Sequence, residues 1–323
     1  MHPIPLLVLM PLDPDRAARI SAGGFAPILA PTPEQRAAAI QASPELRAVL
    51  TNGAMGFTAA EMDALPKLEI ICAIGVGHEN IDVGAASARG IIVTHGPGTN
   101  ASSVADHTLA LLLAVARDIP AADWAAKSGR WMAARQPRAT VSNKRLGILG
   151  LGQIGLEIAR RAQGGFAMEI AYHNRRPRED CAHAWLPSVT VLAEWSDFLV
   201  IAAPGGAATR HLVDARVLAA LGASGFLINI GRGSVVETAA LVDALNRGVI
   251  AGAALDVVDG EPHVPPELAA SPNLILTPHI AGRSPEAIGA TAALVLENLR
   301  AHFAGRPVLT PVNYTKPSWI STD

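Results

Sequence analysis

The sequence has few of the features that mark covalently linked or metal-built scaffolds. It contains only two cysteines, Cys72 and Cys181, in unrelated contexts, so neither a disulfide framework nor a CxxC metal site is available. Charged residues make up 17% of the 323 residues, and the formal net charge is −2. The basic residues are spread along the chain, which excludes the electrostatic footprint of a protein that binds nucleic acid or an anionic membrane. We therefore expect a charged partner to be small.

Long hydrophobic runs are also missing. No segment stays apolar for the roughly twenty residues that a membrane span requires. The apolar start at residues 1–10 has no basic leader and no small-residue cleavage site, so we interpret it as a first buried strand. We expect a cytoplasmic protein. Hydrophobic residues make up 50% of the chain, which allows a large core, and the length favours two domains.

The first hundred residues alternate short apolar runs with Ala-rich helical stretches. These segments are residues 6–9, 33–40, 46–51, 68–74 and 91–94. Strands separated by helices predict a mostly parallel sheet with helices on its faces. The segment 102–116 is apolar almost all round and predicts a long buried helix. It favours a homodimer if it packs between subunits, although burial between or within domains explains it equally well.

A second region of alternating strands and helices begins near Lys144. Its apolar runs are residues 145–149, 168–172, 198–202, 226–230, 252–257 and 274–277, which is typical of a doubly wound parallel sheet. The final predicted helix, 285–303, has no strand of its own, so we expect it to pack back on the first domain. The predicted α/β organisation is a nucleotide-binding domain, 101–283, inserted into a discontinuous substrate-binding domain, 1–100 plus 284–323.

A glycine fingerprint, Gly150-Leu-Gly152-Gln-Ile-Gly155, follows a strand and opens the helix 156–162. The first glycine permits a tight turn, the second allows a pyrophosphate to approach the backbone, and the third brings helix and strand close together. The helix N-terminus, with Gln153 and Ile154, offers N–H groups to the phosphates. Chance glycines in a tight turn are the alternative, but the strand and helix context favours a dinucleotide site.

The end of the next strand predicts which dinucleotide binds. An acidic residue at this position accepts the ribose 2′-hydroxyl of NAD, but here the sequence has Asn174, Arg175 and Arg176. Two guanidinium groups suit a 2′-phosphate by charge and by bidentate geometry. The sequence therefore predicts NADPH/NADP in preference to NAD. The alternative is that both arginines belong to a solvated loop.

Three polar residues follow successive predicted strands of the second sheet: Arg232, Glu261 and His279. Ligands bind at the carboxyl ends of strands in open α/β sheets. Each residue alone is more often structural or a surface charge. Their occurrence together favours a catalytic site.

With these residues in view, nearly the whole chain resembles the D-isomer-specific 2-hydroxyacid dehydrogenases. Besides the glycine fingerprint, the matching stretches are Gly75-Val-Gly-His-Glu-Asn-Ile-Asp82, Val104-Ala-Asp-His107, Ile228-Asn-Ile-Gly-Arg-Gly-Ser-Val-Val236, Leu255-Asp-Val-Val-Asp-Gly-Glu-Pro262 and Leu276-Thr-Pro-His-Ile-Ala-Gly282. The resemblance implies a Rossmann nucleotide domain inserted into a flavodoxin-like substrate domain. Within the family, the chain is most similar to NADP-preferring glyoxylate/hydroxypyruvate reductases and to hydroxyphenylpyruvate or 2-ketogluconate reductases.

The resemblance also implies roles that fit the chemistry of reducing a keto group, which needs a proton donor and a fixed cation. His279 is the expected proton donor, oriented by Glu261, and Arg232 is expected to hold the substrate carboxylate and polarise the carbonyl. Backbone N–H groups of Val76 and Gly77 are expected to complete the carboxylate site. The remaining expected cofactor contacts are Pro204, Ile230, Asp256, which matches the residue at the nicotinamide carboxamide, and Gly282.

The function we expect is NADPH-dependent reduction of a small 2-oxo acid to the D-2-hydroxy acid. His78-Glu79 replaces the aromatic-acid pair of many relatives, which leaves open a bulkier acid, such as a phenylpyruvate or 2-ketogluconate. An NAD-linked dehydrogenase and a non-catalytic, dinucleotide-sensing protein similar to the C-terminal-binding corepressors are further alternatives. No metal site is expected. We interpret His78, His95, His107 and His173 as structural.

Overall fold

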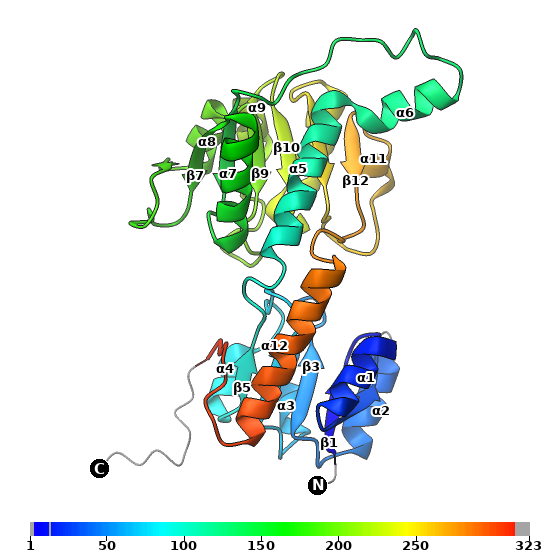
Figure 1. The fold of residues 1–323 in the computed structure, drawn as a ribbon, viewed down its shortest axis with the longest axis vertical. Helices are drawn as coiled ribbons and strands as arrows, with labels where there is room; N and C mark the ends of the chain where they lie inside the picture. Colours follow the sequence, from blue (N-terminus) through cyan, green and yellow to red (C-terminus); the bar gives the residue numbers. More distant parts are fainter. Residues whose placement is uncertain (1–2, 13, 314–323) are drawn as a thin grey trace. The chain divides into compact units, whose positions relative to one another are not determined.

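A computed structural model describes residues 3–12 and 14–313. The chain divides into two compact units, Met1–Asn100 with Pro285–Asp323, and Ala101–Ser284 (Figure 1). The second boundary lies one residue after the predicted one. Residues 314–323 of the predicted substrate-binding domain lie outside the described residues. The assignment of substrate binding to the first unit stays a prediction.

The first unit contains a five-stranded parallel sheet. In spatial order its strands are β2 (Phe25–Leu29), β1 (Ile4–Val8), β3 (Ala48–Thr51), β4 (Ile70–Ala73) and β5 (Ile92–Thr94). Since β2 lies on one side of β1 and β3 on the other, the order reverses between β1 and β3. The sheet is therefore doubly wound, in the order of the flavodoxin-like folds.

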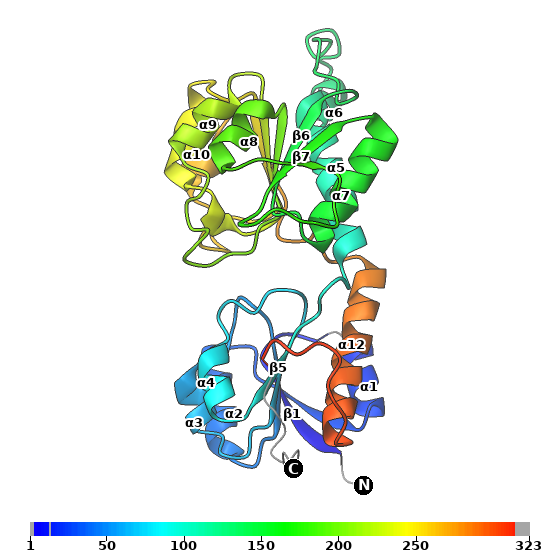
Figure 2. The same cartoon turned by 90° about the vertical axis from the view of Figure 1, so that its left-hand side faces the viewer.

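Helices cover both faces of this first sheet (Figure 2). One face carries α2 (Pro33–Ala42), α3 (Ala59–Asp63) and α4 (Val83–Ala88), and the other carries α1 (Pro14–Ala22) and α12 (Pro285–Phe303). The buried residues Val295, Leu296 and Leu299 of α12 join the core formed by the first strands. The expectation that this last helix packs back on the first unit is confirmed.

The second unit contains a seven-stranded parallel sheet. In spatial order its strands are β12 (Leu274–Leu276), β11 (Gly252–Leu255), β10 (Phe226–Asn229), β9 (Phe198–Ile201), β6 (Arg145–Leu149), β7 (Glu169–His173) and β8 (Ala184–Trp185). The order reverses between β6 and β9, which is where doubly wound sheets bind dinucleotides. This is the Rossmann arrangement predicted for this part of the chain.

The long apolar helix predicted at 102–116 is α5 (Ala101–Arg117), which packs with α7 (Gln153–Phe166) on one face of the second sheet. The opposite face carries α8 (Val189–Trp195), α9 (Ala215–Leu221) and α10 (Thr238–Asn246) (Figure 2). The buried side of α5 joins the core of its own unit. Burial within the unit therefore explains its apolar character without a second subunit.

The helix after α5 behaves differently. α6 (Ile119–Lys127) has no buried residue, and Figure 1 shows it standing away from the sheet of its unit, followed by an extended segment. The remaining helical elements are the 3₁₀ turn η1 (Gly233–Val235) and α11 (Pro266–Ala269), both after strands of the second sheet. Within the described residues, no helix combines the length and the apolar character that a membrane crossing requires.

Candidate active site

The glycine fingerprint forms a turn between β6 and α7, and each of its glycines has a distinct steric reason. Gly150 has a φ of +98°, and a Cβ there would lie 2.7 Å from the backbone N of Ala203. A Cβ on Gly155 would lie 2.5 Å from the carbonyl O of Gly150. At Gly152, by contrast, a Cβ would meet nothing within 4 Å. The backbone at the second glycine is therefore open to an approaching ligand.

The N-terminus of α7 is suited to an anion. Gly152 caps the helix without a side-chain hydrogen bond, and among the described residues the N–H groups of Gln153 and Ile154 donate to no protein acceptor. Asn174 orders the turn, because its Oδ1 accepts the N–H of Leu151 at 2.7 Å. Free N–H groups at the positive end of a helix dipole fit a dinucleotide pyrophosphate.

The loop after β7 contains three arginines, of which one is hydrogen-bonded within the protein and two are exposed without an ion pair to any described residue. Arg178 is engaged, because its guanidinium donates to the Asp180 carboxylate and to the carbonyl O of Leu151 at 3.0 Å. Arg175 and Arg176 are exposed, and neither forms an ion pair with any described residue. Two unpaired guanidinium groups beside the glycine turn fit a phosphate on the adenosine ribose.

Arg232 follows β10, and a buried asparagine fixes its backbone. The side chain of Asn229, 1% exposed, accepts the N–H of Gly231 and donates to the carbonyl O of Arg232, both at 3.0 Å. A Cβ on Gly233 would lie 1.9 Å from the carbonyl C of Val258. This glycine therefore brings the loops after β10 and β11 into contact, and Arg232 lies where they meet.

His279 and Glu261 form the pair predicted from the sequence. Nδ1 of His279 lies 2.7 Å from Oε2 of Glu261, and the two side chains are 49% and 35% exposed. Burial raises the pKa of the Glu261 carboxyl, but the hydrogen bond and charge of His279 outweigh it, helped by the N–H of Val258 and the charge of Arg232. The net pKa of Glu261 lies below its usual 4.5. An ionised Glu261 favours a proton on the facing Nδ1, and the other ring nitrogen is left for a substrate.

Asp256, which the resemblance places at the nicotinamide carboxamide, is buried and bonded within the protein. Its side chain is 1% exposed, and its carboxylate accepts the hydroxyl of Thr277 at 2.5 Å and the N–H groups of Ile280 and Ala281 at 3.0 and 2.9 Å. The N–H of His279 donates to the backbone O of Asp256 at 2.9 Å. Asp256 therefore fixes the loop that carries His279, and its predicted contact with nicotinamide stays a prediction.

The other predicted site residues lie in the loops that follow these strands or in the first unit. Pro204 is exposed after β9, Ile230 is buried after β10, and Gly282 follows the His279 loop. Val76 and Gly77 follow β4 of the first unit, where the Val76 carbonyl O lies near Nδ1 of both His78 and His95, at 3.3 and 3.1 Å. Burial, together with the charge of His78, lowers the pKa of His95.

The sequence interpretation missed Asn229, which lies inside a quoted motif but looks like part of a strand. His107, interpreted as structural, has its Nε2 3.0 Å from Oγ1 of Thr277 and 3.4 Å from Oδ1 of Asp256, but the sequence did not show that it contacts the loop of His279. The only signal in the sequence was its place in the stretch Val104-Ala-Asp-His107. Among the described residues, no cluster of three or more His, Cys, Asp or Glu could hold a metal ion.

Comparison with known proteins gives consistent matches. Residues 109–281 match the family model "D-isomer specific 2-hydroxyacid dehydrogenase, NAD binding domain". Among curated proteins, the chain is 44% identical to glyoxylate/hydroxypyruvate reductase A of Arabidopsis thaliana over 268 residues, which covers 83% of this chain and 85% of that one. It is 40% identical to the 2-ketogluconate reductase of Gluconobacter oxydans over 271 residues, 84% and 87% of the two chains.

Among solved structures, a similar one is an NADPH-dependent glyoxylate/hydroxypyruvate reductase from Sinorhizobium meliloti in complex with NADP and malonate. The TM-score is 0.87 at 39% identity, and the match covers 97% of each chain. The likeness therefore extends over both units, including the loops in which the site residues lie.

Proposed function

The chain belongs to the D-isomer specific 2-hydroxyacid dehydrogenase family, and we propose that it catalyses the NADPH-dependent reduction of a small 2-oxo acid to the D-2-hydroxy acid. The observation that carries this proposal is the His279–Glu261 pair, with Nδ1 and Oε2 2.7 Å apart, in the loops beside Arg232. A protonated imidazole oriented by a carboxylate, next to a guanidinium, is what reduction of a keto acid needs.

Each residue has a defined part in this reaction. Arg232 binds the substrate carboxylate and polarises the keto oxygen, with the N–H groups of Val76 and Gly77 as further proposed carboxylate donors. When bound, NADPH supplies the hydride that reaches C2 of the oxo acid. His279 gives its Nε2 proton to the keto oxygen as negative charge develops there, and Glu261 stabilises the charged ring. In the reverse direction, His279 takes the proton back from the hydroxyl.

The proposed cofactor ligands follow from the geometry of the glycine turn. The pyrophosphate lies against the open backbone at Gly152 and the unbonded N–H groups of Gln153 and Ile154. Arg175 and Arg176 bind the 2′-phosphate, which is the basis for preferring NADPH over NADH. Among the described residues, the Asn174 side chain is engaged through its Oδ1 alone, which leaves its amide nitrogen available.

Glyoxylate and hydroxypyruvate are the proposed substrates, because relatives with those names match most of the chain. A 2-ketogluconate reductase at 40% identity makes a larger hydroxylated oxo acid the second candidate. The test is the oxidation of NADPH and NADH, followed by absorbance, with glyoxylate, hydroxypyruvate, phenylpyruvate and 2-ketogluconate. We expect turnover with NADPH in preference to NADH, and highest kcat/KM for the two smallest acids.

His279→Ala is the control that connects turnover to the proposed site. Losing the proton donor is expected to lower kcat by about 10² to 10⁴-fold, while NADPH binding, followed by nicotinamide fluorescence, stays intact. Tight NADPH binding without turnover on any of the four acids would instead favour a dinucleotide-sensing protein.

We also infer that the chain forms a homodimer. Four large apolar side chains are exposed on α6 and the segment after it: Ile119, Trp124, Trp131 and Met132, at 54%, 62%, 65% and 70%. Several large apolar side chains left exposed within one short stretch of chain are typical of a protein interface, and a second copy of the chain is the proposed occupant. Light scattering after gel filtration is expected to give a dimer for the wild type and a monomer for a Trp131→Asp, Met132→Asp variant.

We further infer that the protein is cytoplasmic. Both cysteines are free, and Cys72 is buried, with burial raising the pKa of its thiol to about 12. Unpaired thiols are usual in reducing compartments. Fractionation of cells expressing the full chain tests the inference, which a periplasmic or secreted pool would contradict.

A further inference from the structure

The first turns of α5 contact the loop that carries His279 at both of its ends. Oγ of Ser103 donates to the carbonyl O of Ala281 at 2.7 Å, and Nε2 of His107 lies 3.0 Å from Oγ1 of Thr277. Ser103 and His107 are four residues apart, so they lie on the same face of the helix. One helix face therefore contacts residue 277 before His279 and residue 281 after it.

The hydrogen bonds at the first end have a fixed direction. The two Asp256 oxygens accept the N–H groups of Ile280 and Ala281, and the Thr277 hydroxyl donates to Oδ1 over 2.5 Å. With its proton used there, the oxygen of Thr277 accepts, which assigns the facing Nε2 of His107 as the donor. A chain of donors running from His107 through Thr277 to a buried carboxylate strengthens each bond in turn.

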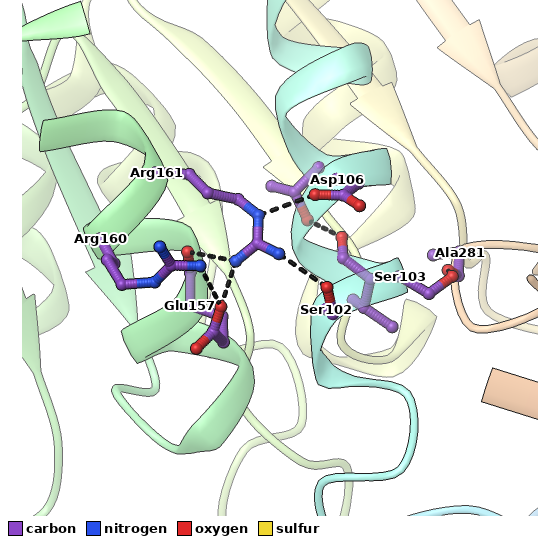
Figure 3. A network of polar contacts seen from close by, with 9 residues as sticks. Ser102, Ser103, Asp106, Glu157, Arg160, Arg161 and Ala281 are labelled. Atoms are coloured by element: carbon purple, nitrogen blue, oxygen red, sulfur yellow. Dashed lines mark hydrogen bonds and ion pairs between the residues drawn. The ribbon is translucent and has the colours of Figure 1, made fainter. Parts of the chain in front are cut away.

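A neighbouring face of α5 is attached to α7, the helix that begins at the glycine turn, as Figure 3 shows. The Arg161 guanidinium donates to Oδ1 of Asp106 and to Oγ of Ser102, both at 2.7 Å. The same guanidinium is paired with Glu157 of its own helix. Its side chain is 17% exposed. Arg161 therefore holds α5 against the helix that begins at the glycine turn.

The backbone of His279 needs such support. Its φ is +54°, in the left-handed region that a residue with a Cβ adopts only when its surroundings hold it there. Two N–H donors to Asp256, from Ile280 and Ala281, hold the loop from within, and α5 holds it from outside. The strained conformation is the one that places the imidazole against Glu261.

We propose that Ser103 and His107 are positioning residues that keep His279 in its catalytic orientation, with Arg161 anchoring the helix that bears them. Neither residue has to touch the substrate or the cofactor. The inference rests on the proposed function, because it assumes that His279 is the proton donor. It assigns His107, which looks from the sequence like an ordinary core histidine, to the support of the catalytic loop.

Steady-state kinetics of the full chain with NADPH and glyoxylate test this proposal. Ser103→Ala and His107→Leu are each expected to lower kcat by about tenfold, as small displacements of a catalytic group do, with little change in either KM. His107→Gln keeps an N–H donor at the reach of Nε2 and is expected to restore most of kcat. Ser196→Ala is the matched control, because its buried Oγ also donates to a backbone carbonyl, that of Leu192 at 2.6 Å, but on the opposite face of the sheet.

The outcomes separate the inference from the proposed function. If the wild type reduces none of the oxo acids, the proposed function fails. If the wild type is active and both variants keep its kcat, or if kcat falls without recovery in His107→Gln, the positioning role is wrong. If His107→Leu fails to fold, Ser103→Ala and His107→Gln still decide the question. Ser103→Ala removes the contact with Ala281, whereas His107→Gln keeps a donor for Thr277.

Discussion

The carboxyl edge of the second sheet presents two groups of charged side chains that are held very differently. Glu261, His279 and the buried Asp256 are connected to each other, to backbone N–H groups and to the Thr277 hydroxyl by bonds of 2.5 to 3.0 Å. Arg175 and Arg176, on the loop after β7, have no partner among the described residues. The protein fixes the first group before any ligand arrives and leaves the second group without internal partners.

The difference reflects what each group is proposed to do. A proton donor contributes most when its geometry is set in advance, because orientation gained during the reaction would add to the barrier. A guanidinium that binds an arriving phosphate needs unused donors. Arg178 lies in the same loop, but its guanidinium already donates to Asp180 and Leu151. The lack of partners at Arg175 and Arg176 is therefore not a general property of arginines in this loop.

The largest expected effect comes from breaking the fixed group at its centre. In Asp256→Asn, an amide N–H₂ replaces one of the oxygens that accept the N–H groups of Ile280 and Ala281, so a donor faces a donor. We expect kcat to fall by about 10²-fold, the loss that a small displacement of the catalytic group causes.

The same variant also decides between the two roles of Asp256. A positioning role lowers kcat and leaves the KM for NADPH close to that of the wild type, whereas a direct contact with nicotinamide raises that KM. Steady-state kinetics at saturating glyoxylate distinguish them. A kcat and a KM for NADPH that both equal those of the wild type would contradict both roles.

An intermediate effect is expected from removing the free group. Arg175→Ala and Arg176→Ala each lose charge-assisted hydrogen bonds of about 1.5–3 kcal/mol, so kcat/KM for NADPH should fall by about tenfold or more. With NADH, which has no 2′-phosphate, kcat/KM should stay nearly constant. Arg247→Ala is the matched control, because Arg247 is an exposed arginine after α10, just before β11 and so near the opposite edge of the sheet. Equal losses with both cofactors would contradict a phosphate-binding role.

The sequence predicted the strands and the fingerprint well, because their signals are local. Apolar runs and a glycine turn are read within a few residues, and β6, β10, β12 and the last helix lie where they were expected. The missed strand β2 has a physical reason. Its sequence includes Pro27, which is unusual in a central strand, and β2 is indeed at the edge of its sheet.

The sequence could not predict which residues come into contact when the chain folds. Asn229 and Asp256 look like interior residues of apolar strands, and only the structure shows which turns their side chains support. The helix α5 was expected to be buried, but its sequence did not say against what. Its polar residues Ser103 and His107 acquire meaning only from a loop about 170 residues further along the chain.

The smallest expected effect concerns the charge of the fixed group. The pKa of Glu261 is lowered in the folded chain, so its ionised form stabilises the fold above its usual pKa of 4.5, and this contribution is lost as the pH falls through the lower folded value. Because Glu261 is 35% exposed, solvent screening keeps the contribution below about 1 kcal/mol. Wild-type Tm should therefore exceed that of Glu261→Gln by about 1–2 °C at pH 6, and the difference should shrink progressively as the pH is lowered below 4.5. Glu179→Gln, an exposed carboxylate without a partner among the described residues, should show no such pH-dependent difference in calorimetry. A Tm difference for Glu261→Gln that stays unchanged as the pH is lowered to the acid limit of the fold would mean that the substitution acts through packing, and the charge of the fixed group would then have no part in holding His279.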